Sequence, residues 1–151
     1  MRHRIDHAIR GREGARIIAL DRGSRSIVEQ VSRHGWGGAR FFYVTERPGQ
    51  PDIVVGDCVP LCTLRGSPAD LRDELSSADV VVMVATGRAE SRVVAQIGAA
   101  CTVRAIVTAG LVIGERAQTS GAVSALRPHA RVIMTSQDER DVIEVLTALR
   151  A

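Results

Sequence analysis

The sequence contains no lysine and no asparagine, and all 20 of its basic residues are arginine. The missing lysine excludes Schiff-base catalysis and the lysine of a Walker phosphate loop. Aromatic residues make up only 3% of the chain, which argues against a surface on which nucleic-acid bases stack. No apolar run approaches the roughly 20 residues of a membrane span, and no signal-peptide segment opens the chain. We therefore expect a cytoplasmic protein without a membrane span.

What the chain does contain is typical of one globular domain. Its 151 residues are 45% hydrophobic and 25% charged, which is enough apolar material for a core of Val, Ile, Leu and Ala. The net charge of +3 permits anionic ligands, but it is too small to indicate nucleic acid as a partner. We expect residues 1–15, which are rich in arginine, to form a basic tail or short helix before a single domain at 16–151.

The predicted fold is organised around residues 78–92. Asp79 precedes an apolar run from Val80 to Ala85, and a glycine turn with a helical pattern follows. Such a short, Val-rich run predicts a buried parallel strand that leads into a helix.

The same reasoning predicts an alternation of strands and helices along the chain. Strands are expected at 16–20, 40–45, 80–85, 104–108 and 131–135, with a further short strand at 52–55 and irregular chain at 56–66. Helices are expected at 24–33, 68–76, 89–100 and 115–126, and from 136–138 onwards. This order predicts a three-layer α/β/α, doubly wound and mainly parallel sheet of about five strands, which is Rossmann-like.

Ligands of such sheets bind outside the carboxyl ends of the strands, and four predicted strands end in threonine. Either the β propensity of threonine or a rim of hydroxyls at a ligand site explains this pattern. Glycine turns and helix starts beside the threonines would offer N–H groups to an anion, and arginines would add positive charge. The candidate ligand-binding residues are Asp21, Arg22, Gly23, Ser24, Arg25, Thr45, Thr86, Gly87, Arg88, Thr108 and Gly110.

The sequence names no cofactor and no catalytic residue. It has no G-x-G-x-x-G after the first predicted strand, no Walker motif and no Gly-x-Ser-x-Gly elbow, and no base is evident for Ser24 or Ser91. Ser24 instead fits the N-cap of the first helix. The carboxylate of Asp21 would oppose an anion unless it pairs with an arginine or holds a sugar hydroxyl.

Three cysteines, Cys58, Cys62 and Cys101, form an odd number without a secretion signal. We expect reduced, structural thiols. The C-x3-C spacing of Cys58 and Cys62 leaves a metal or redox site as the alternative.

Two stretches, 17–45 and 78–108, resemble conserved blocks of the bacterial division GTPase FtsZ and its tubulin relatives. The resemblance spans roughly residues 16–136 and implies a Rossmann-like GTPase fold with a glycine-rich phosphate loop after the first strand. The matching residues are Gly23, Gly35, Gly38, Phe41 and Val44 in the first block, and Ala78, Asp79, Val93, Val94, Ala95 and the strand at 106–108 in the second.

The chain also departs from that family where the nucleotide would bind. Asp21 and Arg22 replace two glycines of the phosphate loop, Thr45 replaces an asparagine contact, and the signature glycine loop is shortened to residues 86–91. The chain also stops before the family's central helix, its acidic loop and its second domain. These differences disfavour GTP hydrolysis.

The favoured expectation is therefore an FtsZ/tubulin-like module without GTPase activity that acts in binding, in regulation or by self-association, with a protein partner or a second copy. The alternative is a protein that binds an anionic small molecule or nucleotide at the Thr/Arg rim, including an enzyme subunit. A cysteine-based metal or redox site is the third hypothesis.

Overall fold

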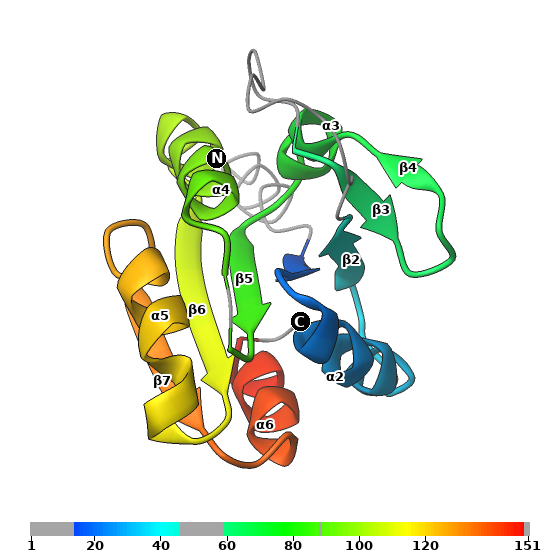
Figure 1. Cartoon of the computed structure of the whole chain (residues 1–151). Helices are drawn as coiled ribbons and strands as arrows, with labels where there is room; N and C mark the ends of the chain where they lie inside the picture. The colour runs from blue at the N-terminus through cyan, green and yellow to red at the C-terminus, as the bar shows by residue number, and fades with distance from the viewer. Residues whose placement is uncertain (1–13, 46–58, 88, 150–151) are drawn as a thin grey trace, which may run out of the picture.

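A computed structural model describes residues 14–45, 59–87 and 89–149. Seven strands form one sheet in the order β4-β3-β2-β1-β5-β6-β7 (Figure 1). Most of the predicted basic tail and the predicted short strand at 52–55 lie outside the described residues.

The centre of the sheet is parallel. β1 (Ala15–Ala19) lies between β2 (Arg40–Val44) and β5 (Val80–Ala85), and β6 (Val107–Ile113) and β7 (Val132–Ser136) follow beyond β5. The predicted α/β class and mainly parallel sheet are confirmed. Because the chain moves from β1 to one neighbour and later returns to the other, the ends of β1 and β5 flank the switch point where such sheets bind ligands.

The edge beyond β2 is antiparallel, and here the prediction of about five strands was wrong. β3 (Leu61–Thr63) pairs antiparallel with β2, and β4 (Pro68–Ala69) pairs antiparallel with β3. Both strands are too short to show alternation in the sequence. Pro68, which was expected to open a helix, lies in an edge strand, where a missing N–H is tolerated. The helix that follows, α3 (Leu71–Leu75), is correspondingly shorter and is capped by Asp70.

Helices cover both faces of the sheet (Figure 1). α2 (Arg22–Ser32) and α6 (Arg140–Ala148) pack on one face, and α3, α4 (Ser91–Val103) and α5 (Arg116–Leu126) pack on the other. Within β5, Val82 and Val84 face α2 and α6, whereas Val81 and Met83 face α4 and α5. The apolar run is continuous because both faces of this strand are buried.

The position of β6 corrects the predicted strand at 104–108. α4 continues to Val103, and Ala105 then adopts a positive φ of 55° before the strand begins. Gly110, expected in a turn, lies inside β6, where an added Cβ would stand 3.1 Å from Cδ1 of Leu126 in α5. Glycine at this position lets α5 pack closely on the strand. Within the described ranges, no helix is both long and apolar enough to cross a membrane.

Candidate functional site

A cleft of about 430 Å³ lies at the carboxyl ends of β1, β2 and β5. Its floor and walls are mostly apolar or small, and two carboxylates face it. The lining residues are Leu20, Asp21, Val44, Thr45, Gly87, Ala89, Glu90, Val93 and Gly121. The cleft therefore lies at the switch point of the sheet, where the sequence predicted the ligand site.

Asp21 lines this cleft, and its carboxylate bonds to both α2 and the end of β5. It is the N-cap of α2: its Oδ1 accepts from the backbone N–H of Ser24 at 2.8 Å, and the Ser24 hydroxyl accepts from the Asp21 N–H at 3.1 Å. Ser24 is thus the N3 residue of a capping box, not the N-cap that was predicted. Oδ2 accepts from the backbone N–H of Thr86 at 2.8 Å, and Oδ1 accepts from the Thr86 hydroxyl at 2.9 Å. Two N–H groups that could hold an anion, that of Ser24 in the first turn of α2 and that of Thr86 after β5, are therefore bonded within the protein.

Gly23 serves this same contact. An added Cβ at Gly23 would stand only 2.4 Å from the Thr86 hydroxyl oxygen. The first turn of α2 and the end of β5 can approach each other this closely only because residue 23 has no side chain. The role of Gly23 in the structure is therefore packing against Thr86.

Of the three arginines predicted to attract an anion, the two that the structure describes do not line the cleft. The Arg25 guanidinium lies 3.7 Å from the centre of the Tyr43 ring and pairs with Glu29 at 3.1 Å. Arg22 is exposed at the start of α2 and does not line the cleft. Arg88 lies outside the described residues.

The predicted threonine rim is only partly present. Thr45 lines the cleft, and both its N–H and its hydroxyl donate to the carbonyl of Pro60. Thr108, by contrast, is the second residue of β6, and its hydroxyl donates to the carbonyl of His129 at 2.6 Å. Thr108 and Gly110 therefore do not lie at the carboxyl ends of the strands. The prediction placed them there because Ala109-Gly110 was interpreted as a turn.

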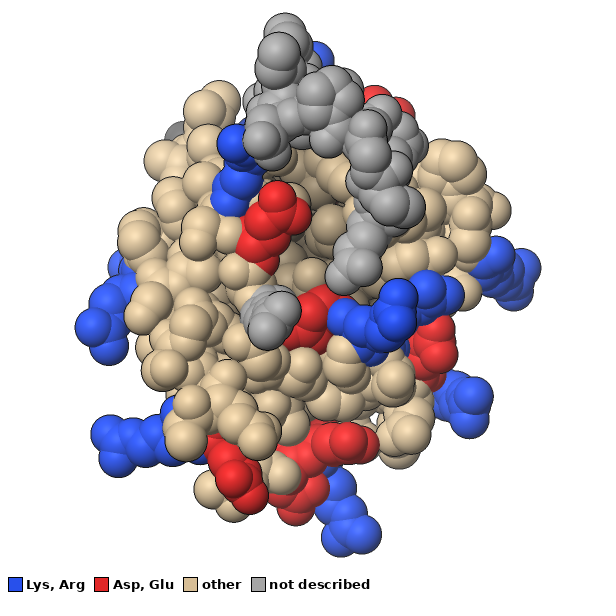
Figure 2. Space-filling model, viewed as in Figure 1, with Lys and Arg blue, Asp and Glu red and all other residues tan. Residues whose placement is uncertain are grey.

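The charged residues in the described lining of the cleft are both acidic. Asp21 and Glu90 are the charged residues among those lining it, and Glu90 is the N-cap of α4 without a capping bond from its side chain. Figure 2 shows acidic side chains near the middle of this face and over α6, with arginines mostly around the margin. These two carboxylates would repel a phosphate bound beside them, and they would attract a cationic group.

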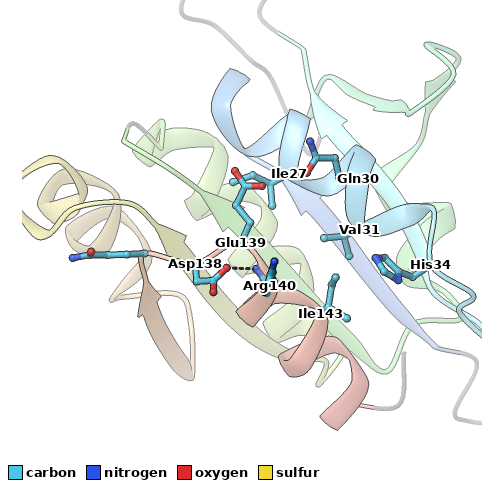
Figure 3. Close-up of a pocket in the computed structure, with 9 residues that line it drawn as sticks. Ile27, Gln30, Val31, His34, Asp138, Glu139, Arg140 and Ile143 are labelled. Atoms are coloured by element: carbon cyan, nitrogen blue, oxygen red, sulfur yellow. Dashed lines mark hydrogen bonds between the residues drawn. The ribbon is translucent and has the colours of Figure 1, made fainter.

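A second hollow of about 660 Å³ lies between α2 and α6 (Figure 3). Ile27, Val31 and Ile143 supply its apolar lining, and Gln30, His34 and the segment 137–140 supply its polar rim. The Asp138 carboxylate at this rim accepts from the backbone N–H of Arg140 at 2.9 Å. The hollow is larger than the cleft, but it lies between helices rather than at the switch point, so the cleft remains the site that the topology favours.

The described cysteines do not form a joint site. Cys101 is fully buried on the face of α4 and α5, whereas Cys62 packs on the face of α2 and α6. Burial raises the pKa of the Cys101 thiol to about 11, and nearby Arg104 opposes this only in part. Cys58 lies outside the described residues, and the parts of the chain that are described hold no group of three potential metal ligands.

The sequence did not reveal most of the apolar lining of the cleft. Leu20, Val44 and Val93 resemble core residues, and nothing local marks their position at a strand end or helix start. Gly121 did carry a signal, because a glycine inside the predicted helix at 115–126 costs helix stability and usually has a packing reason. Glu90, just before the first turn of α4, was a second signal.

Fold and cleft together define an α/β protein with a mostly parallel seven-stranded sheet and a cleft at its switch point. No protein-family model matches the sequence, and no curated protein matches it.

Proposed function

We propose that this chain is a binding or regulatory module of FtsZ/tubulin-like type without GTPase activity, which acts by self-association or through a protein partner. One observation carries the proposal: the Asp21 carboxylate accepts the N–H groups of Ser24 and Thr86. In a phosphate loop these are the kinds of groups that bind the nucleotide. With Asp21 bonded to them, a phosphate would have to displace a carboxylate of the same charge.

The resemblance to the FtsZ/tubulin family supports the same proposal. The strand, helix and strand at 15–44 follow the order of that family's first block, and the residues that depart from it are Asp21 and Arg22. The structural cost of the departure is small, because Asp21 caps α2 and joins it to β5. An aspartate at position 21, where the family has a glycine, is thus compatible with a stable fold that no longer binds phosphate.

Calorimetric titration with GTP, GDP, ATP and NAD tests this proposal. We expect no heat of binding with any of them and no phosphate release from GTP in the presence of Mg²⁺. Binding of GTP at micromolar concentration together with turnover would overturn the proposal.

A second candidate is a protein that binds a small molecule in the cleft. The observation that favours it is the cleft itself, whose volume of about 430 Å³ lies in the range of small-molecule sites. Its carboxylates favour an uncharged or cationic ligand over the anionic one predicted from the sequence.

Obstructing the cleft distinguishes the two candidates. Gly121 is exposed and lines the cleft, and a Cβ there would stand 3.9 Å from the Gly87 carbonyl oxygen. Gly121→Leu should therefore fill the cleft without forcing the backbone apart. In a thermal-shift screen of small molecules, stabilising compounds should lose their effect on G121L and keep it on Gln30→Leu, which alters the other hollow. If no compound stabilises the wild-type protein, the second candidate is dropped.

A further inference from the structure

The strand at the end of the sheet, β7, has an uncovered apolar face. Val132 is 52% exposed and Met134 is 46% exposed, although both lie in a strand. α6 covers the neighbouring strands through Val142 and Leu146, but it leaves the edge open. Edge strands of this kind are templates for pairing with another strand.

The exposed apolar side chains continue on the same face of the sheet. Val132 pairs with Ala109 and Met134 with Leu111 in the parallel register, so these four side chains share one face. Val107, two positions before Ala109, shares that face and is 43% exposed. The apolar surface therefore extends from β7 onto the start of β6.

The backbone of β7 offers hydrogen-bonding groups to a further strand. The N–H of Gly114, which follows β6, donates to the Ser136 carbonyl at 2.8 Å, and with the register of the two strands this sets the phase of the ladder. Because alternate residues of a strand direct their N–H and C=O groups to opposite sides, Val132 and Met134, like Ser136, direct theirs toward β6. Ile133 and Thr135 direct theirs away from β6. The strand carries no proline and no charged residue, which are common protections of an edge.

We propose that β7 pairs antiparallel with β7 of a second copy of this chain, around a two-fold axis beside Ile133. The inference rests on the proposed function, because it identifies the surface and the partner of the self-association proposed there. In this register Val132 of each copy lies opposite Met134 of the other. Ile133 of the two copies then forms the hydrogen-bonded pair at the axis. Val132 and Met134 form the non-hydrogen-bonded pairs on either side, where side chains lie closest and the apolar ones cover one another across the seam. The contact is isologous and closes at two copies.

The charges at the two ends of β7 favour a second copy in this orientation. Arg127 and Arg131 precede the strand, whereas three acidic residues and one arginine, Asp138, Glu139, Arg140 and Asp141, follow it. Antiparallel pairing brings the basic end of each copy beside the acidic end of the other, at both ends of the seam. Parallel pairing would bring like charges together, which is unfavourable. The edge is thus complementary to itself in one orientation.

Sedimentation equilibrium of the full chain, from about 1 to about 200 µM, tests this inference by mass action. We expect the wild-type protein to form a dimer. Met134→Lys and Val132→Lys should each weaken the dimer by about tenfold or more, because a lysine at the seam loses hydration and repels its copy. Val103→Lys is the matched control. Val103 is 84% exposed, but it lies at the end of α4, on the other face of the sheet. The V103K protein should therefore dimerise as strongly as the wild-type protein.

A charge exchange tests the orientation. Arg131→Glu and Glu139→Arg should each weaken the dimer, and the double variant should restore it. Circular dichroism and thermal unfolding establish that each variant folds. If M134K does not fold, V132K replaces it in the sedimentation experiment.

Two outcomes would overturn the inference. One is a wild-type protein that stays monomeric throughout the concentration range. The other is a dimer that M134K, V132K and V103K leave equally strong, which would place the contact on a different surface. GTP binding with turnover would overturn the proposed function without altering either sedimentation result, so the two failures are distinguishable.

Discussion

At the scale of single residues, Asp21 joins two parts of the chain that are 65 positions apart in sequence. Its carboxylate caps α2 and holds the end of β5 through both the N–H and the hydroxyl of Thr86. The sequence suggested that Asp21 opposes an anion, and it left open whether an arginine or a sugar hydroxyl would satisfy the carboxylate. The sequence does not indicate Thr86 as the partner, because the contact between Asp21 and Thr86 is made only in the folded chain.

Replacing Asp21 with alanine should lower the free energy of unfolding by about 1–3 kcal/mol. The loss of an N-cap costs about 1 kcal/mol, and the Thr86 N–H loses its partner as well. Urea unfolding measures the change. Ser26→Ala, at an exposed position of the same helix, is the control and should stay within about 0.5 kcal/mol of wild type. Equal effects for the two variants would contradict the role assigned to Asp21.

Cys101 should make the stability of the protein depend on alkaline pH. Its pKa is raised by burial from 9.0 to about 11, so the folded state keeps its proton in a range where the unfolded state releases it. The stabilising contribution is therefore complete below pH 9 and is lost as the pH rises to 11. The loss amounts to at most about 3 kcal/mol.

Urea unfolding at several values of pH between 9 and 11 measures this dependence. Few other side chains titrate between pH 9 and 11, because the chain has no lysine and only one tyrosine. Cys101→Ala should be less stable throughout, because it leaves a cavity, but its stability should fall less over the same range. A parallel decline in both proteins would assign the effect to other groups.

At the scale of elements, a glycine in a helix can allow another residue to pack directly against the helix backbone. Gly98 of α4 lies against His129, and an added Cβ would stand 2.7 Å from the Cβ of that histidine. Gly121 of α5 has room, since its nearest neighbour would be 3.9 Å away. Both glycines occupy the interiors of helices, so the sequence alone cannot distinguish them.

The two glycines should respond oppositely to alanine. Gly98→Ala should destabilise the protein by about 1–3 kcal/mol, because His129 must move. Gly121→Ala should stabilise it by up to about 1 kcal/mol through helix propensity. Thermal and urea unfolding of the pair measure both signs. A stabilising Gly98→Ala would mean that α4 does not pack on His129 as described.

Element boundaries show why sequence reasoning succeeded in the centre of the sheet and failed at its edge. β5 was predicted with its observed bounds because six consecutive apolar residues require burial on both faces. β3 and β4 were not predicted because two or three residues carry no period, and their pairing with β2 depends on chain that is distant in sequence. β6 was shifted because a glycine inside a strand looks like a turn.

At the scale of the whole molecule, Arg16 ties together segments that meet at the amino end of the sheet. It is only 4% exposed, its Nε donates to the Glu74 carbonyl at 3.1 Å, and its Nη2 donates to the Ser77 hydroxyl at 2.9 Å. The Glu74 carboxylate also pairs with Arg40 at 3.0 Å. The same carboxylate lies 3.4 Å from Nε of Arg16, so it forms ion pairs with a buried arginine and with an exposed one.

Arg16→Met should therefore be far more damaging than Arg40→Met. The first leaves Glu74 and its neighbours without their buried partner and should cost about 3–5 kcal/mol. The second removes a pair whose arginine is 57% exposed, and such pairs contribute at most about 1 kcal/mol. Chemical unfolding of both variants under the same buffer measures the difference. Similar losses would show that the interactions of Arg16 at this end of the sheet add little.

The sequence by itself determined the α/β class and the order of the central strands and helices. Those features follow from local apolar runs and turns, which act over a few residues. Only the tertiary structure decided that Asp21 bonds to Thr86, that Arg25 lies on Tyr43, and that β7 leaves Val132 and Met134 uncovered. These outcomes depend on which distant segments come together, and side-chain partners across a sheet leave no periodic trace in the chain.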